Sequence, residues 1–124
     1  WCLRWSKGVY MKVSLVVQVP DSKVKAVNEV ECSQHISLIE MVKRIYKIEQ
    51  KFVCCGETDL WAIGKLDTNT EKGRWWTMTI NGDFLKTNAE SILHKEDIIE
   101  LVYEQTGSEK ILITKEELIG YKLS

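Results

Sequence analysis

The sequence predicts an α+β domain in which a single helix packs on a mostly antiparallel sheet. The segment Tyr10–Val19 alternates apolar and polar residues, and the segment Ser37–Gln50 carries apolar residues at helical spacing. An Asn81–Gly82 pair follows the strand-like stretch Arg74–Ile80. Alternation is typical of a half-buried strand, and Asn-Gly is the strongest short signal for a hairpin turn. Together these observations predict one central helix with strands before it and after it in the sequence.

Composition places the chain among ordinary globular domains and excludes some partners. The 124 residues, 44% hydrophobic and 28% charged, suffice for one core. The net charge of -1 comes without a basic stripe, which argues against nucleic acid as a partner. No apolar run approaches the roughly 18 residues of a membrane span, so we expect no transmembrane segment.

The first two strands are expected to form an antiparallel pair. In Tyr10–Val19, alternate residues are apolar and face one side, which predicts a strand with one buried face. Pro20 ends it. The segment Val24–Cys32 alternates more weakly and is the expected partner strand.

The segment Ser37–Gln50 is expected to be the central helix. Ser37 and Glu40 stand at the two positions of a capping box. Five apolar residues then fall on one helical stripe, which is typical of core packing. These residues are Leu38, Met41, Val42, Ile45 and Ile48.

The rest of the chain is expected to supply short strands and polar loops. The expected strands are Lys51–Cys55, Leu60–Leu66, Arg74–Ile80, Ile98–Tyr103 and Lys110–Thr114. Residues 67–73 and 87–96 are expected to be loops, with Glu96 and Asp97 in a solvated turn. A helical turn is predicted after Thr114, because Thr114 and Glu117 stand at capping-box positions.

The cysteines suggest an oxidising compartment. The chain contains Cys2, Cys32, Cys54 and Cys55. This even count, in a small chain that begins with Trp1, suggests a secreted protein that has lost a signal peptide. A bond between the adjacent Cys54 and Cys55 would close a strained ring. Pairing of these two with Cys2 and Cys32 is therefore favoured.

The sequence offers no set of residues for catalysis or metal binding. The adjacent cysteines lack the spacing of zinc sites, and neither His35 nor His94 stands at a supporting interval. There is no Gly-x-Ser-x-Gly nucleophile turn, and the glycines are too scattered to cradle a phosphate. We therefore expect a protein that is not an enzyme and holds no metal.

The tryptophans suggest a binding surface. Trp75 and Trp76 are neighbours in one predicted strand, so their side chains must face opposite sides of the sheet. One indole therefore lies outside the core. Either the aromatic arm at residues 1–9 covers it, or it is available to a flat apolar ligand. The second alternative predicts an exposed cluster of Trp61 and Trp76.

A family resemblance rests on the order of these features. The Trp75-Trp76 pair, the Ile80-Asn81-Gly82 turn and the later acidic strand Glu96–Glu104 together resemble the DUF4430 domain. That domain is also the small C-terminal β-domain of the cobalamin carriers transcobalamin, gastric intrinsic factor and haptocorrin. The resemblance covers residues 10–105 and implies a β-grasp-like fold. Residues 1–9 would then be an N-terminal arm, and residues 106–124 a C-terminal strand and helical turn.

The resemblance implies a secreted, non-enzymatic module that binds cobalamin, another corrinoid or another flat apolar ligand. In the carriers this domain caps the vitamin against a helical barrel, which has no counterpart in these residues. The positions implied to touch the ligand are Thr58, Asp59, Leu60, Trp61, Ala62, Ile63, Trp76, Thr77, Met78, Asn81, Gly82, Phe84 and Leu85. The alternative is an extracellular structural or assembly protein, self-associating or disulfide-linked, that uses the same fold without a small ligand.

Overall fold

The structure is a computed structural model that describes residues 10–52 and 58–123. Its elements, with η for a 3-10 turn, are β1 (Tyr10–Val19), η1 (Pro20–Ser22), β2 (Val24–Ser33), α2 (Leu38–Lys43), β3 (Ile48–Phe52), β4 (Thr58–Ile63), β5 (Leu66–Asp67), η3 (Thr70–Lys72), β6 (Arg74–Ile80), β7 (Ile98–Gln105) and α3 (Lys115–Gly120). The expected α+β class is confirmed. The described part of the chain contains two short α-helices instead of one.

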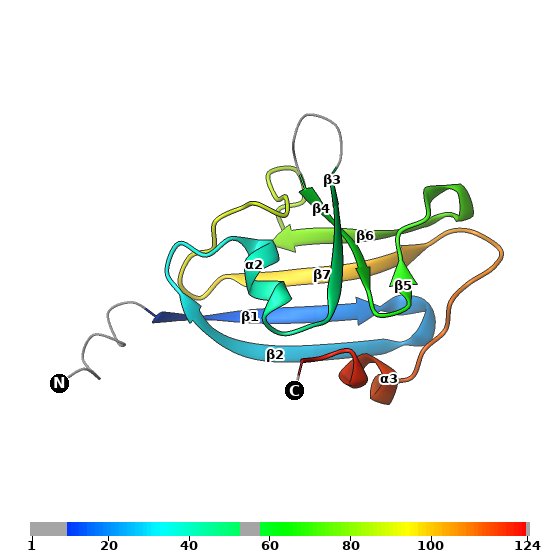
Figure 1. Cartoon of the computed structure of the whole chain (residues 1–124), viewed down its shortest axis with the longest axis horizontal. Coiled ribbons are helices and arrows are strands. Elements are labelled where there is room, and N and C mark those ends of the chain that lie inside the picture. Colours follow the sequence, from blue (N-terminus) through cyan, green and yellow to red (C-terminus); the bar gives the residue numbers. More distant parts are fainter. Residues whose placement is uncertain (1–9, 53–57, 124) are drawn as a thin grey trace.

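The strands form two sheets. The main sheet has the order β2-β1-β7-β6, and a smaller sheet has the order β3-β4-β5. Among the described strands, every pairing is antiparallel except that of β1 with β7, which is parallel. Figure 1 shows α2 and the smaller sheet in front of the main sheet, so the core lies between these two layers.

The period of β1 determines which of its residues enter this core. The apolar residues predicted to share a face are all buried: Met11, Val13, Leu15, Val17 and Val19. Val24–Ser33 pairs antiparallel with β1, as expected, and Val19 lies opposite Val24. The other side of the main sheet, here called the outer face, carries mostly polar and half-exposed side chains.

The central helix is much shorter than its apolar stripe predicted. Ser37 caps it as expected, because its hydroxyl accepts a hydrogen bond from the Glu40 N–H (3.3 Å). The helix nevertheless ends at Lys43, and β3 has begun by Ile48. The intervening backbone bonds to the C-terminal segment instead of continuing the helix: Lys47 N donates to Tyr121 O and Leu123 N donates to Ile45 O, both at 2.8 Å. A long-range contact therefore overrides the local helical pattern.

Two other predicted strands are also altered. The stretch expected as one strand at Leu60–Leu66 is divided by a turn at Gly64, whose φ of +59° is left-handed. The strand expected at Lys110–Thr114 is absent from the described structure. The Gln105 side chain satisfies both backbone groups of Ile111 (2.7 and 2.9 Å), so no neighbouring strand is needed there. The helical turn after Thr114 is confirmed as α3, with a complete capping box.

Candidate ligand-binding surface

The loop between β6 and β7, residues 81–97, begins with the predicted hairpin turn. Asn81 has φ +52° and Gly82 has φ +80°, and Ile80 bridges to Asp83 across them. Positive φ at both central residues is the geometry that favours Asn-Gly. The turn is therefore confirmed, although the returning chain makes only this bridge before it leaves the sheet.

A buried carboxylate holds the two ends of the loop together. Asn81 Nδ2 donates to Asp97 Oδ1 (2.9 Å), while Asn81 Oδ1 accepts from the Ile98 N–H (2.9 Å). The second Asp97 oxygen accepts from the His94 backbone N–H (2.7 Å). Asp97 is thus buried, which corrects the expected solvated turn. The reason is that both of its oxygens find donors across the loop.

The middle of the loop is anchored to the core. Ala89 and Leu93 are almost completely buried. The first N–H groups of α2, which have no partner within a helix, donate to this loop: Leu38 N to Ser91 O (2.8 Å) and Ile39 N to Ala89 O (2.9 Å). The loop is therefore held in place from α2 as well as from both strands.

The loop nevertheless exposes apolar side chains. Phe84 is 60% exposed and Leu85 is 91% exposed. Beside them lies an open hollow of about 600 Å³. Its walls comprise Ile80, Asn81, Asp83, Lys86, Thr87, Ser91, Ile92, His94 and Asp97. We call Phe84 and Leu85 the apolar tip. Exposed apolar side chains that lie together make this loop a candidate contact surface.

The first predicted ligand segment lies in β4, and most of its described side chains are in the core. Leu60, Ala62 and Ile63 are buried. Trp61 faces the other way and is half-buried, with Lys51 Nζ at 4.1 Å from the centre of its ring. A lysine so placed makes a cation–π contact. Thr58 and Asp59 belong to β4, but their side chains lie outside the description. Trp61 therefore presents the only described surface of this segment.

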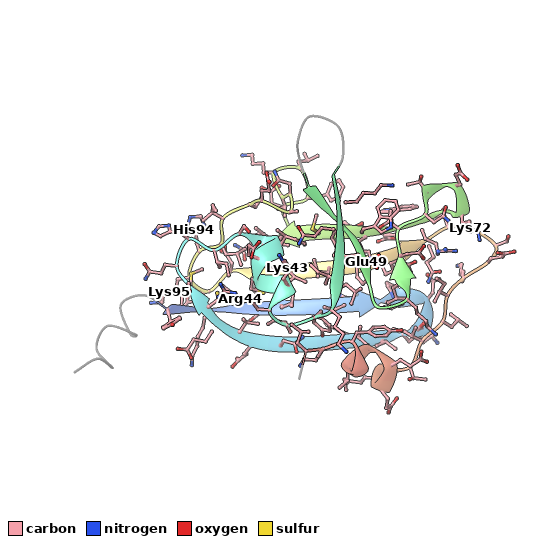
Figure 2. The ribbon with its side chains drawn as sticks, in the orientation of Figure 1. Lys43, Arg44, Glu49, Lys72, His94 and Lys95 are labelled. Atoms are coloured by element: carbon pink, nitrogen blue, oxygen red, sulfur yellow. The ribbon has the colours of Figure 1, made fainter. Side chains whose placement is uncertain are left out.

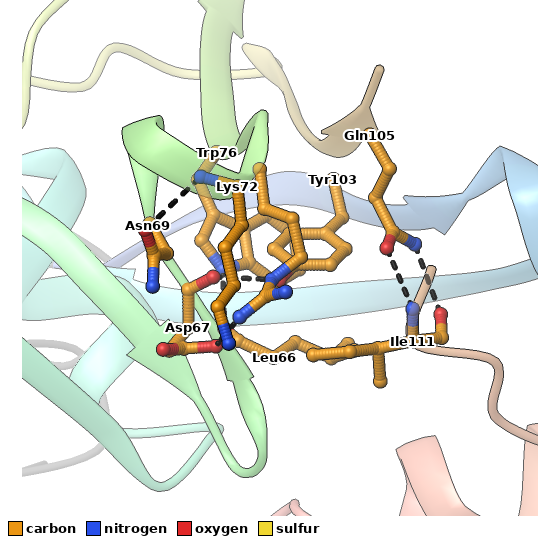
Figure 3. A network of polar contacts seen from close by, with 9 residues as sticks. Leu66, Asp67, Asn69, Lys72, Trp76, Tyr103, Gln105 and Ile111 are labelled. Carbon is orange, nitrogen blue, oxygen red and sulfur yellow. Dashed lines mark hydrogen bonds and ion pairs between the residues drawn. The ribbon is translucent and has the colours of Figure 1, made fainter. Parts of the chain in front are cut away.

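The second predicted segment divides between core and surface. Trp76 and Met78 are buried, while Thr77 is half-buried on the outer face. The Trp76 Nε1–H donates to Leu66 O (2.9 Å), and its ring lies 4.9 Å from that of Tyr103. Figure 3 shows this contact joining β5 to β6 and β7. The expected exposed Trp61–Trp76 cluster is therefore wrong, because Trp76 is a core residue.

Trp75 is the indole of the Trp75–Trp76 pair that lies outside the core. It alternates with Trp76 along β6 and lies half-buried on the outer face, as the strand period requires. The aromatic arm, which is one of the two alternatives for this indole, lies outside the described residues. Of the predicted surface, the structure thus brings together Asn81, Gly82 and the apolar tip at one end of the main sheet.

Some residues of this surface were missed from the sequence. Ile92 and His94 line the hollow although they lie beyond the turn. The His94 imidazole points away from the molecule (Figure 2) and its side chain is 81% exposed. In the sequence, His94 is a lone histidine in a predicted loop, and nothing indicated that it would line a hollow. In the sequence, Ile92 and Ile98 are apolar residues next to polar ones. That pattern did not indicate that both side chains are exposed.

The polar contacts around Trp76 predict an alkaline loss of stability. Burial raises the pKa of the Tyr103 phenol above its ordinary value of 10.0, although Arg74 nearby opposes this. Its hydroxyl donates to Asp67 O (2.6 Å). Above about pH 10 the unfolded chain therefore loses this proton before the folded chain does, so stability falls as pH rises. We expect Tyr103→Phe to show a smaller fall in unfolding free energy between about pH 8 and pH 11 than the unaltered chain.

The measurement is urea unfolding followed by circular dichroism at both pH values. Equal falls in the two proteins would show that Tyr103 does not contribute. Burial also raises the pKa of Tyr46. That phenol is present in both proteins, so it does not affect the comparison.

The structure is also informative about cysteines, metals and membranes. The expected disulfides stay predictions, and within residues 10–52 and 58–123 Cys32 is a buried free thiol. It is enclosed by the core that β2 faces, whereas Cys2, Cys54 and Cys55 lie outside the description. The described residues contain no cluster of three or more His, Cys, Asp or Glu side chains that could hold a metal ion. None of their helices is long and apolar enough to cross a membrane.

Neither a protein-family model nor a curated protein sequence matches the chain. Among solved structures, the fold is similar to that of haptocorrin in complex with Cbi, with a TM-score of 0.63 and 13% identity over 77% of this chain. It is also similar to a Ruminococcus gnavus protein described provisionally as metal-binding, with a TM-score of 0.61 and 17% identity over 77% of this chain.

These similarities show a shared fold. The match covers 25% of the haptocorrin chain and 98% of the Ruminococcus gnavus chain. The expected likeness to the transcobalamin family is thus supported by the structure, whereas no family model assigns the DUF4430 domain.

Proposed function

We propose that this chain is a non-enzymatic binding domain that holds a flat apolar ligand, such as a corrinoid, against the apolar tip and the adjoining hollow. The observation that carries the proposal is the exposure of Phe84 and Leu85 on a loop that is anchored at both ends and in the middle. Secretion stays a prediction from the sequence.

The ordered loop explains why the apolar tip suits a ligand. Phe84 and Leu85 cannot reach the core, because buried Ala89 and the Asn81–Asp97 contact hold the chain around them. Burying one such side chain contributes about 1.5–3 kcal/mol. Since the loop is already ordered, little of that gain is lost to ordering it on binding.

The free energy gained by burying the apolar tip is too small for tight binding. The domain is therefore expected to form only one wall of a binding site. Two side chains supply about 3–6 kcal/mol on full burial, and association costs a similar amount. Weak binding is therefore expected for the chain alone, with a dissociation constant of about 1 mM. The similarity to haptocorrin, whose structure contains Cbi and whose chain is much longer, supports this view.

The proposal is tested by removing the apolar tip. We expect the Phe84→Ser/Leu85→Ser variant to bind cobalamin at least tenfold more weakly than the unaltered chain, because the apolar contact area is lost. Equilibrium dialysis with absorbance detection of cobalamin measures this directly. Both residues are exposed, so the melting temperature should hardly change.

Leu112→Ser is the matched control. Leu112 is 62% exposed, close to the value for Phe84, but it lies in the segment before α3. Equal losses of cobalamin binding in the control and in the double variant would contradict a site at the apolar tip. Failure of the unaltered chain to bind cobalamin at millimolar concentration would argue against a corrinoid ligand.

A further inference from the structure

β2 forms one edge of the main sheet, and the direction of its backbone groups can be deduced from β1. Ser14 N donates to Asp97 O (2.9 Å), and Lys12 O accepts from Glu96 N (2.8 Å). The even-numbered residues of β1 therefore turn their backbone groups toward β7 and away from β2. In an antiparallel pair, the residues opposite them must turn theirs away from β1.

The residues opposite are known from the register. Gln18, Val16 and Ser14 of β1 lie opposite three residues of β2, namely Lys25, Val27 and Glu29. The backbone N–H and C=O groups of these β2 residues thus point out of the sheet edge. Within the described part of the chain they make no hydrogen bond. Such an edge can pair with another strand.

The side chains along this edge are unusual in their order. Lys25, Val27 and Glu29 are exposed on the outer face, and Val27 is 63% exposed. Charged residues usually discourage edge pairing. Here the charges of opposite sign stand at equal distances on either side of an apolar residue, so the edge is complementary to itself when turned by 180°.

We propose that β2 pairs antiparallel with β2 of a second copy of this chain, with the two-fold axis at Val27. Val27 then lies opposite the second copy's Val27, and Lys25 lies opposite the second copy's Glu29. Each of these pairs exchanges both backbone hydrogen bonds, because all the residues involved direct their groups outward. The two main sheets become one continuous sheet, and their outer faces lie on the same side.

This register is favoured over its neighbours. Centring the pair on Lys25 or Glu29 places like charges opposite each other, which is destabilising. Centring it on Ala26 or Asn28 places Val27 opposite a charged residue. Only the Val27-centred register combines an apolar pair at the axis with opposite charges on both sides.

The element beside β2 is compatible with this pairing. Figure 1 shows α3 next to β2. Its Leu118 is buried in the core, and Lys122 Nζ donates to Asn28 Oδ1 (2.6 Å), so this segment contacts β2 from the core side. Ile119 and Leu123 are exposed on the same segment and offer further apolar area to a second copy. Homodimer interfaces are more apolar than the rest of a protein surface, so such side chains suit a contact between two copies.

Sedimentation of the full chain under reducing conditions provides the first test. Between about 10 µM and 1 mM, the range of weak specific association, we expect the mass to rise from 14.4 kDa toward twice that value. Val27→Pro should remain monomeric throughout. This substitution removes an N–H that the monomer does not use, and proline is tolerated at sheet edges.

The second test concerns the register. Lys25→Glu and Glu29→Lys should each weaken dimerisation about tenfold, because opposite charges are replaced by like charges. The combined Lys25→Glu/Glu29→Lys variant should restore it, since the signs are merely exchanged. Lys72→Glu is the control: Lys72 lies on η3, away from β2 (Figure 2), and its substitution should change nothing.

Several outcomes would overturn the proposal. A monomer at every concentration excludes the dimer, and a dimer that survives Val27→Pro excludes pairing through β2. Failure of the combined variant to recover excludes the Val27-centred register. If Val27→Pro fails to fold by circular dichroism, the three charge variants still decide the question.

Discussion

Trp76→Ala is expected to lower the free energy of unfolding by about 3–5 kcal/mol, the range for truncating a buried large side chain. Trp76 is buried against Tyr103, and its Nε1–H donates to Leu66 O, so the substitution leaves a cavity and a carbonyl without its donor. It also detaches β5 from the main sheet. Urea unfolding followed by circular dichroism measures the loss.

Trp75→Ala is the matched control for this prediction. It removes the same side chain from the next residue of the same strand, but from the half-exposed outer face. Its expected cost is about 1 kcal/mol, within the ordinary range for partly exposed positions. A larger loss for Trp75→Ala than for Trp76→Ala would reverse the assignment of the two faces.

Gly64→Ala is expected to cost about 2–5 kcal/mol. The left-handed φ of +59° costs an L-residue about 1–2 kcal/mol. A Cβ at this position would also lie only 2.5 Å from the Tyr121 ring, and overpacking of this kind costs about 1–3 kcal/mol more. Moving Tyr121 would disturb the hydrogen bond from Lys47 N to Tyr121 O. Thermal and urea unfolding give the value.

Gly82→Ala separates the two contributions. Gly82 also has positive φ, at +80°, but a Cβ there meets nothing within 4 Å. Its expected cost is therefore about 1–2 kcal/mol, from backbone strain alone. In a Tyr121→Ala background, Gly64→Ala should cost no more than Gly82→Ala. A persistent excess in that background would show that the Tyr121 contact is not its cause.

Local patterns predicted several strands, turns and helix starts correctly. The alternation of β1 identified its buried face, and the Asn81–Gly82 pair identified a turn with two positive φ values. Thr114 and Glu117 identified the start of α3. These features succeed because the deciding interactions lie within a few residues along the chain.

The candidate surface was predicted less well. Among the positions that the resemblance implies to touch a ligand, Asn81, Gly82, Phe84 and Leu85 are exposed. Trp76, Met78 and Ile63 are buried. Strand periodicity shows that Trp75 and Trp76 face opposite sides. It cannot show which side the second layer covers, because that depends on where β3–β5 pack.

By itself the sequence determined the α+β class, the two faces of β1 and β6, and the capped or turning positions. The tertiary structure decided where the helix stops and which tryptophan is buried. It also decided that Asp97 closes the β6–β7 loop and that β2 lies at a free edge. The physical reason is separation along the chain. Lys47 contacts Tyr121, and Asn81 contacts Asp97, only after the chain has folded back on itself. Such contacts override local preference when they satisfy buried backbone groups.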